Sequence, residues 1–213
     1  MQLFNRTSKP NGTSGAAPSR SAIQFLLMQP GGRSRSNGAG SVIAFTSANA
    51  GAGVSHVVRK LGAQLAAQTR EPTAIVEAER LAKLQPTDLT DLRAKCARTN
   101  IDQLWILRKA ANGNGKQPSS PTSEIAGGFD CVQKLRSTFS HVLLDCPPIS
   151  DSPEAPFLAS QVDGVVLVVE ADHTKRDQIL RARHALEMAG GSLLGMVLNK
   201  RRHVVPGWLY RML

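Results

Sequence analysis

The sequence predicts an α/β protein in which a mainly parallel sheet lies between two layers of helices, a three-layer α/β/α fold. From residue 41 onward, short apolar runs alternate with amphipathic stretches, as expected when each strand is followed by a helix that packs back onto the sheet. The runs contain few polar residues, and strands buried on both faces belong to parallel sheets. With 213 residues, the chain suffices for one domain with tails and is too short for two full domains.

The order of elements follows from the apolar pattern. The first expected strand, residues 42–46, runs into a loop of small residues at 47–53, and a helix begins at Val54. Apolar residues then recur at the spacing that gathers them on one helix face. Further along, we expect strands at 73–76, 104–107, 141–145, 164–169 and 193–198, helices at 129–138 and 175–189, and a long loop rich in Gly, Asn, Pro and Ser at 110–123.

The net charge of +10 is concentrated at the two ends of the chain. Residues 1–40 supply +5 and residues 200–213 supply +4, and neither segment contains an acidic residue. The first segment is also rich in Ser, Gly, Pro and Asn, a composition that favours disorder. We therefore expect a basic, largely disordered segment at 1–40, a folded domain at 41–199 and a basic-aromatic tail at 200–213.

Basic tails suit an anionic membrane surface or an acidic partner, and they also serve solubility. A nucleic-acid site would place its charge on the folded domain, so nucleic acid is not an expected partner. No apolar run approaches the roughly 20 residues of a membrane span, and residues 22–28 lack the features of a secretory signal. We expect a cytoplasmic protein that can contact the inner face of the plasma membrane. Cys96, Cys131 and Cys146 are expected as reduced thiols, because their odd number and wide spacing suit neither disulfides nor zinc.

A strand, a loop of small residues and a helix form an arrangement that binds phosphate. Glycines in such a loop let backbone N–H groups close around the anion at a helix N-terminus. Two later segments strengthen this interpretation: one expected strand ends in Asp145 and continues into Cys146-Pro147-Pro148, and the last expected strand ends in Asn199.

Taken in order, these segments resemble those of the bacterial tyrosine kinases and capsular-exopolysaccharide ATPases. In that family a loop reading Pro-Gly-Glu-Gly-Lys-Ser is followed by a strand ending Asp-Ala-Asp, then by Asp-x-Pro-Pro, then by a strand reading Gly-x-Val-Leu-Asn. The resemblance covers residues 41–199. It implies a P-loop NTPase-like fold, ATP and Mg²⁺ as cofactors, and an inner-membrane polysaccharide chain-length (co-polymerase) protein as partner.

The resemblance assigns roles to the residues of the loop. Gly51, Ala52, Gly53 and Val54 match positions around the phosphates of the nucleotide, and Ser55 matches the magnesium ligand. An ordinary strand-to-helix turn is the alternative for the glycines, and a plain hydroxyl at a helix N-terminus is the alternative for Ser55.

Four further residues are assigned in the same way. Asp145 matches the carboxylate that engages the metal through water in relatives, and Asn199 matches a residue near the adenine base. Glu77 and Glu79 replace the acidic pair of the Asp-Ala-Asp segment and keep both charges on longer side chains. These two glutamates and Asp145 are the candidate catalytic residues, with a solvated acidic turn as the alternative for the glutamates.

Val54 stands where the family has lysine. A cation about 4 Å from a phosphate oxygen contributes about 4 kcal/mol at an effective dielectric of about 20. Because each 1.4 kcal/mol is about tenfold in rate, we expect a loss of about two to three orders of magnitude. Arg59 and Lys60 lie further into the helix and are expected to lead away from the loop. Asn49 stands where septum-placing and chromosome-partitioning ATPases carry a second lysine.

Two further departures concern activity and assembly. The chain has one tyrosine, Tyr210, where the family's kinases end in a tyrosine cluster that they phosphorylate. Residues 21–40 lack the Glu-x-x-Arg-x-x-Arg helix that joins relatives into a ring. Autophosphorylation by the family's route is therefore not expected, and a homo-oligomer remains an open alternative.

The favoured hypothesis is a catalytically impaired P-loop ATPase, similar to tyrosine kinases, that acts as a regulatory subunit in capsule or exopolysaccharide biosynthesis or export. One alternative is a weakly active ATP-binding tyrosine kinase or ATPase of the same pathway. Another is a partitioning-type ATPase that binds nucleic acid, and both the charge distribution and Asn49 count against it.

Overall fold

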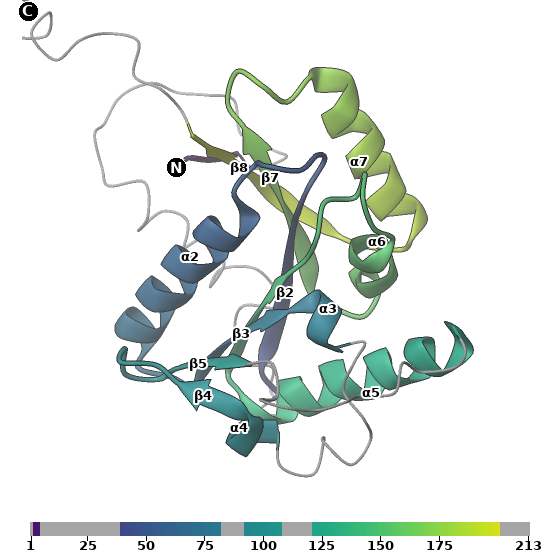
Figure 1. The fold of residues 1–213 in the computed structure, drawn as a ribbon. Helices are drawn as coiled ribbons and strands as arrows, with labels where there is room; N and C mark the ends of the chain where they lie inside the picture. Colours follow the sequence, from purple (N-terminus) through teal and green to yellow (C-terminus); the bar gives the residue numbers. More distant parts are fainter. Residues whose placement is uncertain (1, 5–38, 82–91, 108–120, 201–213) are drawn as a thin grey trace, which may run out of the picture.

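A single eight-stranded sheet forms the centre of the structure (Figure 1). The computed structural model describes residues 2–4, 39–81, 92–107 and 121–200. Within these ranges the strand order is β1-β8-β7-β2-β6-β3-β5-β4, and neighbouring strands are parallel except β1 with β8 and β4 with β5. The strands are β1 Gln2–Phe4, β2 Ser41–Ser47, β3 Thr73–Glu77, β4 Cys96–Arg98, β5 Leu104–Leu107, β6 His141–Asp145, β7 Gly164–Glu170 and β8 Leu193–Asn199.

Helices cover both faces of this sheet, as Figure 1 shows. α2 packs against β2, β3, β5 and β6 on one face, whereas α5, α6 and α7 pack on the other. The predicted three-layer α/β/α fold with a mainly parallel sheet is therefore confirmed. The helices are α2 Val54–Thr69, α3 Ala78–Leu81, α4 Leu92–Lys95, α5 Pro121–Thr138, α6 Glu154–Ala159 and α7 Arg176–Met188.

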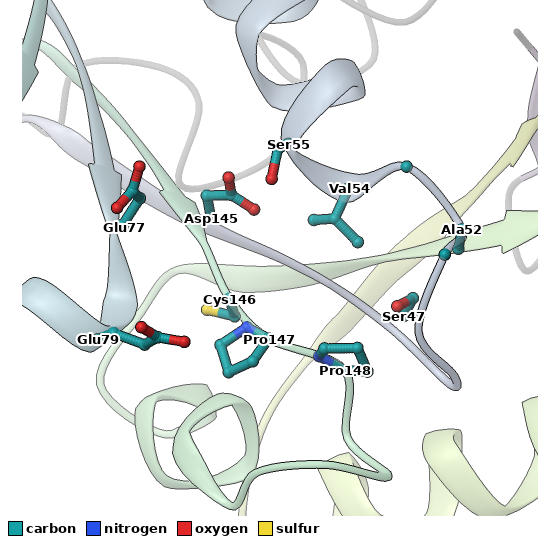
Figure 2. Close-up of a pocket in the computed structure, with 12 residues that line it drawn as sticks. Ser47, Ala52, Val54, Ser55, Glu77, Glu79, Asp145, Cys146, Pro147 and Pro148 are labelled. Atoms are coloured by element: carbon teal, nitrogen blue, oxygen red, sulfur yellow. The ribbon is translucent and has the colours of Figure 1, made fainter.

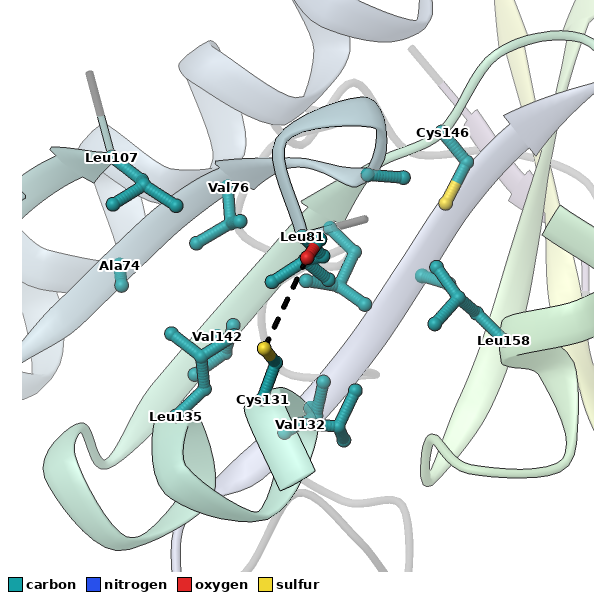
Figure 3. Close-up of a cluster of buried hydrophobic side chains, with 14 of the residues drawn as sticks. Ala74, Val76, Leu81, Leu107, Cys131, Val132, Leu135, Val142, Cys146 and Leu158 are labelled. Carbon is teal, nitrogen blue, oxygen red and sulfur yellow. Dashed lines mark hydrogen bonds between the residues drawn. The ribbon is translucent and has the colours of Figure 1, made fainter. Parts of the chain in front are cut away.

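Strand β2 illustrates how the sheet is buried on both faces. Val42 and Ala44 lie in the core beneath α5 and α6, and Ile43 and Phe45 lie in the core beneath α2. Since side chains alternate between the two faces of a strand, a run that contacts a helix layer on each side must be apolar throughout. Figure 3 shows part of the core beneath α5 and α6. Here the Cys131 thiol donates to the carbonyl of Leu81, with 3.9 Å between sulfur and oxygen.

Helix α2 begins directly after the loop that leaves β2. Its buried residues lie on one face at the predicted spacing, and Trp105 of β5 also lies in the core, where it is 7% exposed. Gly53 before the helix and Arg70 after it both have left-handed backbone. At Arg70 this conformation ends the helix, as is common at helix C-termini. The buried residues of α2 are Val54, Val57, Val58, Leu61, Gly62, Leu65 and Ala66.

The register of the parallel strands brings their carboxyl ends together. Asp145, the last residue of β6, lies opposite Phe45 of β2 on one side and Glu77 of β3 on the other. In α/β sheets, ligands bind in the crevice at this edge. The crevice lies at the topological switch point, where successive connections leave a strand toward opposite sides of the sheet. β2, with β6 and β7 as its neighbours, is at this position.

A buried ion pair fixes the end of α5 against the start of β7. Arg136 donates to both carboxylate oxygens of Asp163 at 2.7 and 2.8 Å, and the two side chains are 7% and 4% exposed. Asp163 also accepts a hydrogen bond from the Val42 amide at 2.7 Å, and Arg136 donates to the Gly40 carbonyl at 3.1 Å. The pair thereby ties α5 and β7 to the start of β2.

Most expected elements are confirmed to within one residue at each end, including the helix at 175–189. The boundary between the expected loop at 110–123 and the expected helix at 129–138 needs correction. α5 begins at Pro121, eight residues before the expected start at residue 129 and inside the loop expected at 110–123. Proline is favoured at the first helical position, where its missing N–H costs no hydrogen bond, but the Gly-rich composition around it hides the helix. Residues 110–120 of the expected loop lie outside the described residues.

The expected end segments are described only in part. Gln2–Phe4 form strand β1, antiparallel to β8, within the segment that the sequence predicts to be largely disordered. The sequence did not predict this strand, because a strand this short carries no readable period; that the segment as a whole is largely disordered stays a prediction. Residues 5–38 and the tail from 201 lie outside the described residues. Among the described helices, none combines the length and apolar character needed to cross a membrane.

Candidate functional site

A cavity opens at the carboxyl ends of β2, β3 and β6, between the loop after β2 and the turn after β6 (Figure 2). Its volume of about 400 Å³ is in the range of small-molecule sites. The sequence-predicted residues lie here together, apart from Asn199. The lining residues are Ser47, Gly51, Ala52, Gly53, Val54, Ser55, Glu77, Glu79, Asp145, Cys146, Pro147 and Pro148.

The loop depends on two glycines with left-handed backbone. Gly51 has a φ of 86° and Gly53 a φ of 83°, a conformation that other residues adopt at a cost. At Gly53 there is also no room for a side chain, since a Cβ would lie 2.5 Å from the amide nitrogen of Asn199. The bend presents the backbone of residues 51–55 to the cavity, the arrangement that favours an anion at the N-terminus of α2.

Asn199 lies on the loop, outside the cavity lining. Its side-chain amide donates to the Ala52 carbonyl at 2.8 Å. The last residue of β8 therefore holds the loop in place through a contact between segments far apart in the sequence. The role near an adenine base remains a prediction.

Val54 lies at the place that the resemblance gives to a lysine. It is the first residue of α2, is 8% exposed and lines the cavity, and Figure 2 shows its side chain between Ser55 and Ala52. A valine brings neither charge nor a hydrogen-bond donor. In the described part of the chain, none of the residues that line the cavity is basic.

Asp145 is the most perturbed carboxylate of the cavity. Burial raises its pKa above the ordinary value of 3.8, while a hydrogen bond from the Ser55 hydroxyl lowers it. The negative charge of Glu77 raises this pKa further, and the positive charge of Arg59 opposes it. Arg59 therefore influences Asp145 electrostatically but does not line the cavity. The contact between Ser55 and Asp145 brings together the two predicted metal ligands.

The two glutamates differ in their surroundings. Glu77 forms an ion pair with Arg80, whose guanidinium also donates to the Leu107 carbonyl at 3.1 Å. Glu79 is exposed at the rim of the cavity. Since one carboxylate already has a cationic partner and the other faces solvent, Asp145 is the best placed of the three acids beside a ligand in the loop.

Metal binding at this site requires a ligand that brings its own oxygens. Across the described residues, no group of three or more His, Cys, Asp or Glu side chains is arranged to hold a metal ion. Mg²⁺ in phosphate sites is commonly held by one or two protein groups together with phosphate oxygens and water. Ser55 and Asp145 fit that requirement.

The cysteines are free thiols, as expected, and all three are buried. Burial raises the pKa of Cys146, the one cysteine that lines the cavity, and also raises that of Cys96, to about 11. A thiol that keeps its proton is a poor nucleophile. We therefore assign Cys146 a packing role.

One charged pair beside the loop was not predicted from the sequence. The Lys200 amine lies 3.1 Å from the Glu170 carboxylate, and the Lys200 side chain reaches the outer side of Gly53. The sequence placed Lys200 in the tail, and only its position directly after Asn199 could have indicated this contact.

Known proteins are similar to this chain in sequence over part of its length, and in fold. No protein-family model matches the chain. It is 30% identical over 112 residues to the tyrosine-protein kinase CpsD of Streptococcus agalactiae, which covers 52% of the chain and 47% of that kinase. The chain thus spans about half the length of this relative.

Solved structures show the same fold. The match to the chimerical protein CapA2B2 covers 85% of this chain and 81% of the CapA2B2 chain, with a TM-score of 0.63 and 24% identity. The kinase domain of the Escherichia coli tyrosine kinase ETK matches 88% and 76%, with a TM-score of 0.65 and 16% identity. The septum site-determining protein MinD of Pyrococcus horikoshii, complexed with Mg-ADP, matches 81% and 76%, with a TM-score of 0.55 and 16% identity.

The likeness to CpsD rests on sequence and the likeness to the kinase domains rests on fold, and both point the same way. The chain is therefore similar in sequence to a bacterial tyrosine-protein kinase over about half of its length, and it has the fold of bacterial tyrosine kinase domains.

Proposed function

We propose that this protein binds Mg·ATP in the loop of residues 50–55 without transferring its phosphate efficiently, and that it acts as a regulatory subunit in capsule or exopolysaccharide biosynthesis or export. The observation that carries the proposal is the place of Val54. An uncharged side chain lines the cavity at the first residue of α2, where the family resemblance puts lysine.

The residues present fit a magnesium nucleotide in part. Backbone N–H groups of the loop would hold the phosphates, because Gly51 and Gly53 adopt the required bend. Ser55 and Asp145, which lie close enough for the Ser55 hydroxyl to lower the pKa of the carboxyl group, would hold the metal. Magnesium bound there would supply the positive charge that neutralises the β- and γ-phosphate oxygens.

The same residues explain why transfer is slow. Phosphoryl transfer depends on cations placed where negative charge develops. This cavity instead contains three carboxylates, those of Glu77, Glu79 and Asp145. Without the lysine, about 4 kcal/mol of stabilisation is missing at an effective dielectric of about 20. The deficit corresponds to about two to three orders of magnitude in rate.

A partner follows from the family resemblance. We propose an inner-membrane polysaccharide chain-length (co-polymerase) protein, next to which the chain would lie at the inner face of the membrane. The match to the chimerical protein CapA2B2 supports looking for such a partner. Binding of the nucleotide would then change the surface that the chain offers to its partner, and the chain would regulate the partner in this way.

A weakly active kinase or ATPase is the second candidate. The observation in its favour is the presence of cations near the loop, since Arg59 acts on Asp145 and Lys200 lies beside Gly53. No contact of the described residues favours the nucleic-acid alternative.

Calorimetric titration with ATP, in the presence and absence of Mg²⁺, tests whether the chain binds the nucleotide. We expect binding that strengthens with Mg²⁺, and we expect the bound nucleotide to be recovered as ATP when the complex is denatured after an hour. Failure to bind at millimolar ATP would reject nucleotide binding. Recovery as ADP would favour the weakly active enzyme.

A further inference from the structure

The positively charged side chain of Lys200 lies beside the loop of residues 50–55, on the outer side of that loop. A Cβ built on Gly53 would lie 3.9 Å from the Cε of Lys200. The amine of Lys200 lies 3.1 Å from one oxygen of Glu170, and the other oxygen of that carboxylate lies 3.9 Å from a Cβ built on Gly51. The ion pair therefore lies along the loop, with its two members beside the two glycines.

Neighbouring strand ends fix this position. Glu170 is the last residue of β7 and lies opposite Asn199, the last residue of β8. The Ala171 amide donates to the Asn199 carbonyl at 2.9 Å, which joins the two strands beyond their last pair. Lys200 follows with a φ of 58°, in the left-handed region, so the chain turns at the loop. The backbone that carries the amine is thus held against the site.

The side chain of Lys200 can move while its backbone is held. It is 48% exposed, whereas Glu170 is 18% exposed. A pair of this exposure is weak, because water and salt screen it. A triphosphate carries several negative charges, so it competes well with a single carboxylate for a lysine amine.

We propose that the Lys200 amine contacts a bound triphosphate from the outer side of the loop, and that Glu170 holds the amine when the loop contains no phosphate. The amine strengthens binding in this way but does not take the place of the lysine missing at Val54, so transfer stays slow. This inference rests on the proposed nucleotide binding. Lys200 is then a binding residue, and its positive charge reaches the phosphates from the end of β8 instead of from the start of α2.

Other described cations suit this role less well. Arg59 lies one helical turn beyond Ser55 and acts on Asp145, where it balances the acidic side of the cavity. Lys60 is exposed on α2, six residues after Val54. Lys60→Met is therefore a control with the same loss of charge as Lys200→Met.

The test uses calorimetric titration of the full chain with inorganic tripolyphosphate and, separately, with ATP, both with Mg²⁺. Loss of a charge-assisted hydrogen bond weakens binding by about tenfold or more. We expect Lys200→Met to show that loss for both ligands and Lys60→Met to bind as the unmodified chain does. Glu170→Gln should bind several-fold more tightly, because it no longer competes for the amine.

Each other outcome overturns the inference. If Lys200→Met and Lys60→Met bind tripolyphosphate equally, the amine does not reach phosphate. If Lys200→Met weakens ATP binding alone, the side chain contacts the base or sugar. In both cases the unmodified chain still binds nucleotide, so the proposed function stands. If the unmodified chain binds neither ligand, the inference and nucleotide binding fail together. Thermal unfolding of Lys200→Met at the unmodified temperature shows that the variant is folded.

Discussion

Substitution of Val54 by lysine should restore much of the missing catalysis. The side chain starts at the first residue of α2 and faces the cavity, so a lysine there needs no change in backbone. A cation about 4 Å from a phosphate oxygen contributes about 4 kcal/mol at an effective dielectric of about 20. Attraction of the new amine to Asp145 in the empty site offsets part of this, leaving about 3 kcal/mol, or about two orders of magnitude in turnover.

The assay is release of radiolabelled phosphate from the γ position of ATP under saturating Mg·ATP, with binding measured in parallel by calorimetry. Val54→Met is the matched control, since methionine has a long side chain without charge. We expect Val54→Lys to exceed both the unmodified chain and Val54→Met. If Val54→Lys binds ATP but turns over no faster than Val54→Met, the lost charge is not what limits transfer, and the reasoning fails.

Three further predictions concern stability and pH, and urea unfolding measures all of them. The pKa of Asp145 is raised in the folded protein, so the contribution of Asp145 to the free energy of unfolding is lost as pH rises from 3.8 through the raised value. Asp145→Asn should therefore match the unmodified chain in stability near about pH 3 and be more stable than it near about pH 7. Equal pH profiles would contradict this. Asp163→Asn should lower the free energy of unfolding by about 3–5 kcal/mol, because Arg136 keeps a buried charge without its counterion; a loss below about 1 kcal/mol would mean that the pair is not buried in solution. Gly53→Ala should cost about 1–3 kcal/mol, because its φ is positive and a Cβ would lie 2.5 Å from the Asn199 amide; an unchanged midpoint would show that the loop adopts another conformation.

The sequence was informative where strands and helices are long and lie in the core. β7 is apolar from Gly164 to Val169 and buried along that run, and α2 shows its buried face in its spacing. Short elements were missed because three or four residues show no period, as in β1 and α3. The first turns of α5 were missed because their small polar residues are equally typical of a loop.

The site was predictable as far as strand ends determine it. Asp145 and Glu77 lie side by side in the register of β6 and β3, and parallel strands place such residues at one edge of the sheet. The pair of Lys200 and Glu170 depends on how β7 and β8 pair and on a backbone turn after β8, which no local pattern encodes. The effect of Arg59 on Asp145 likewise depends on tertiary distance.

Turnover of the unmodified chain tests the central claim most directly. Phosphate release and tyrosine phosphorylation would be measured at saturating Mg·ATP beside the CpsD kinase of Streptococcus agalactiae under identical conditions. We predict that this chain is slower by about two to three orders of magnitude although ATP is bound. Rates equal to those of the kinase would contradict the account, since the valine in the loop would then have no effect on transfer.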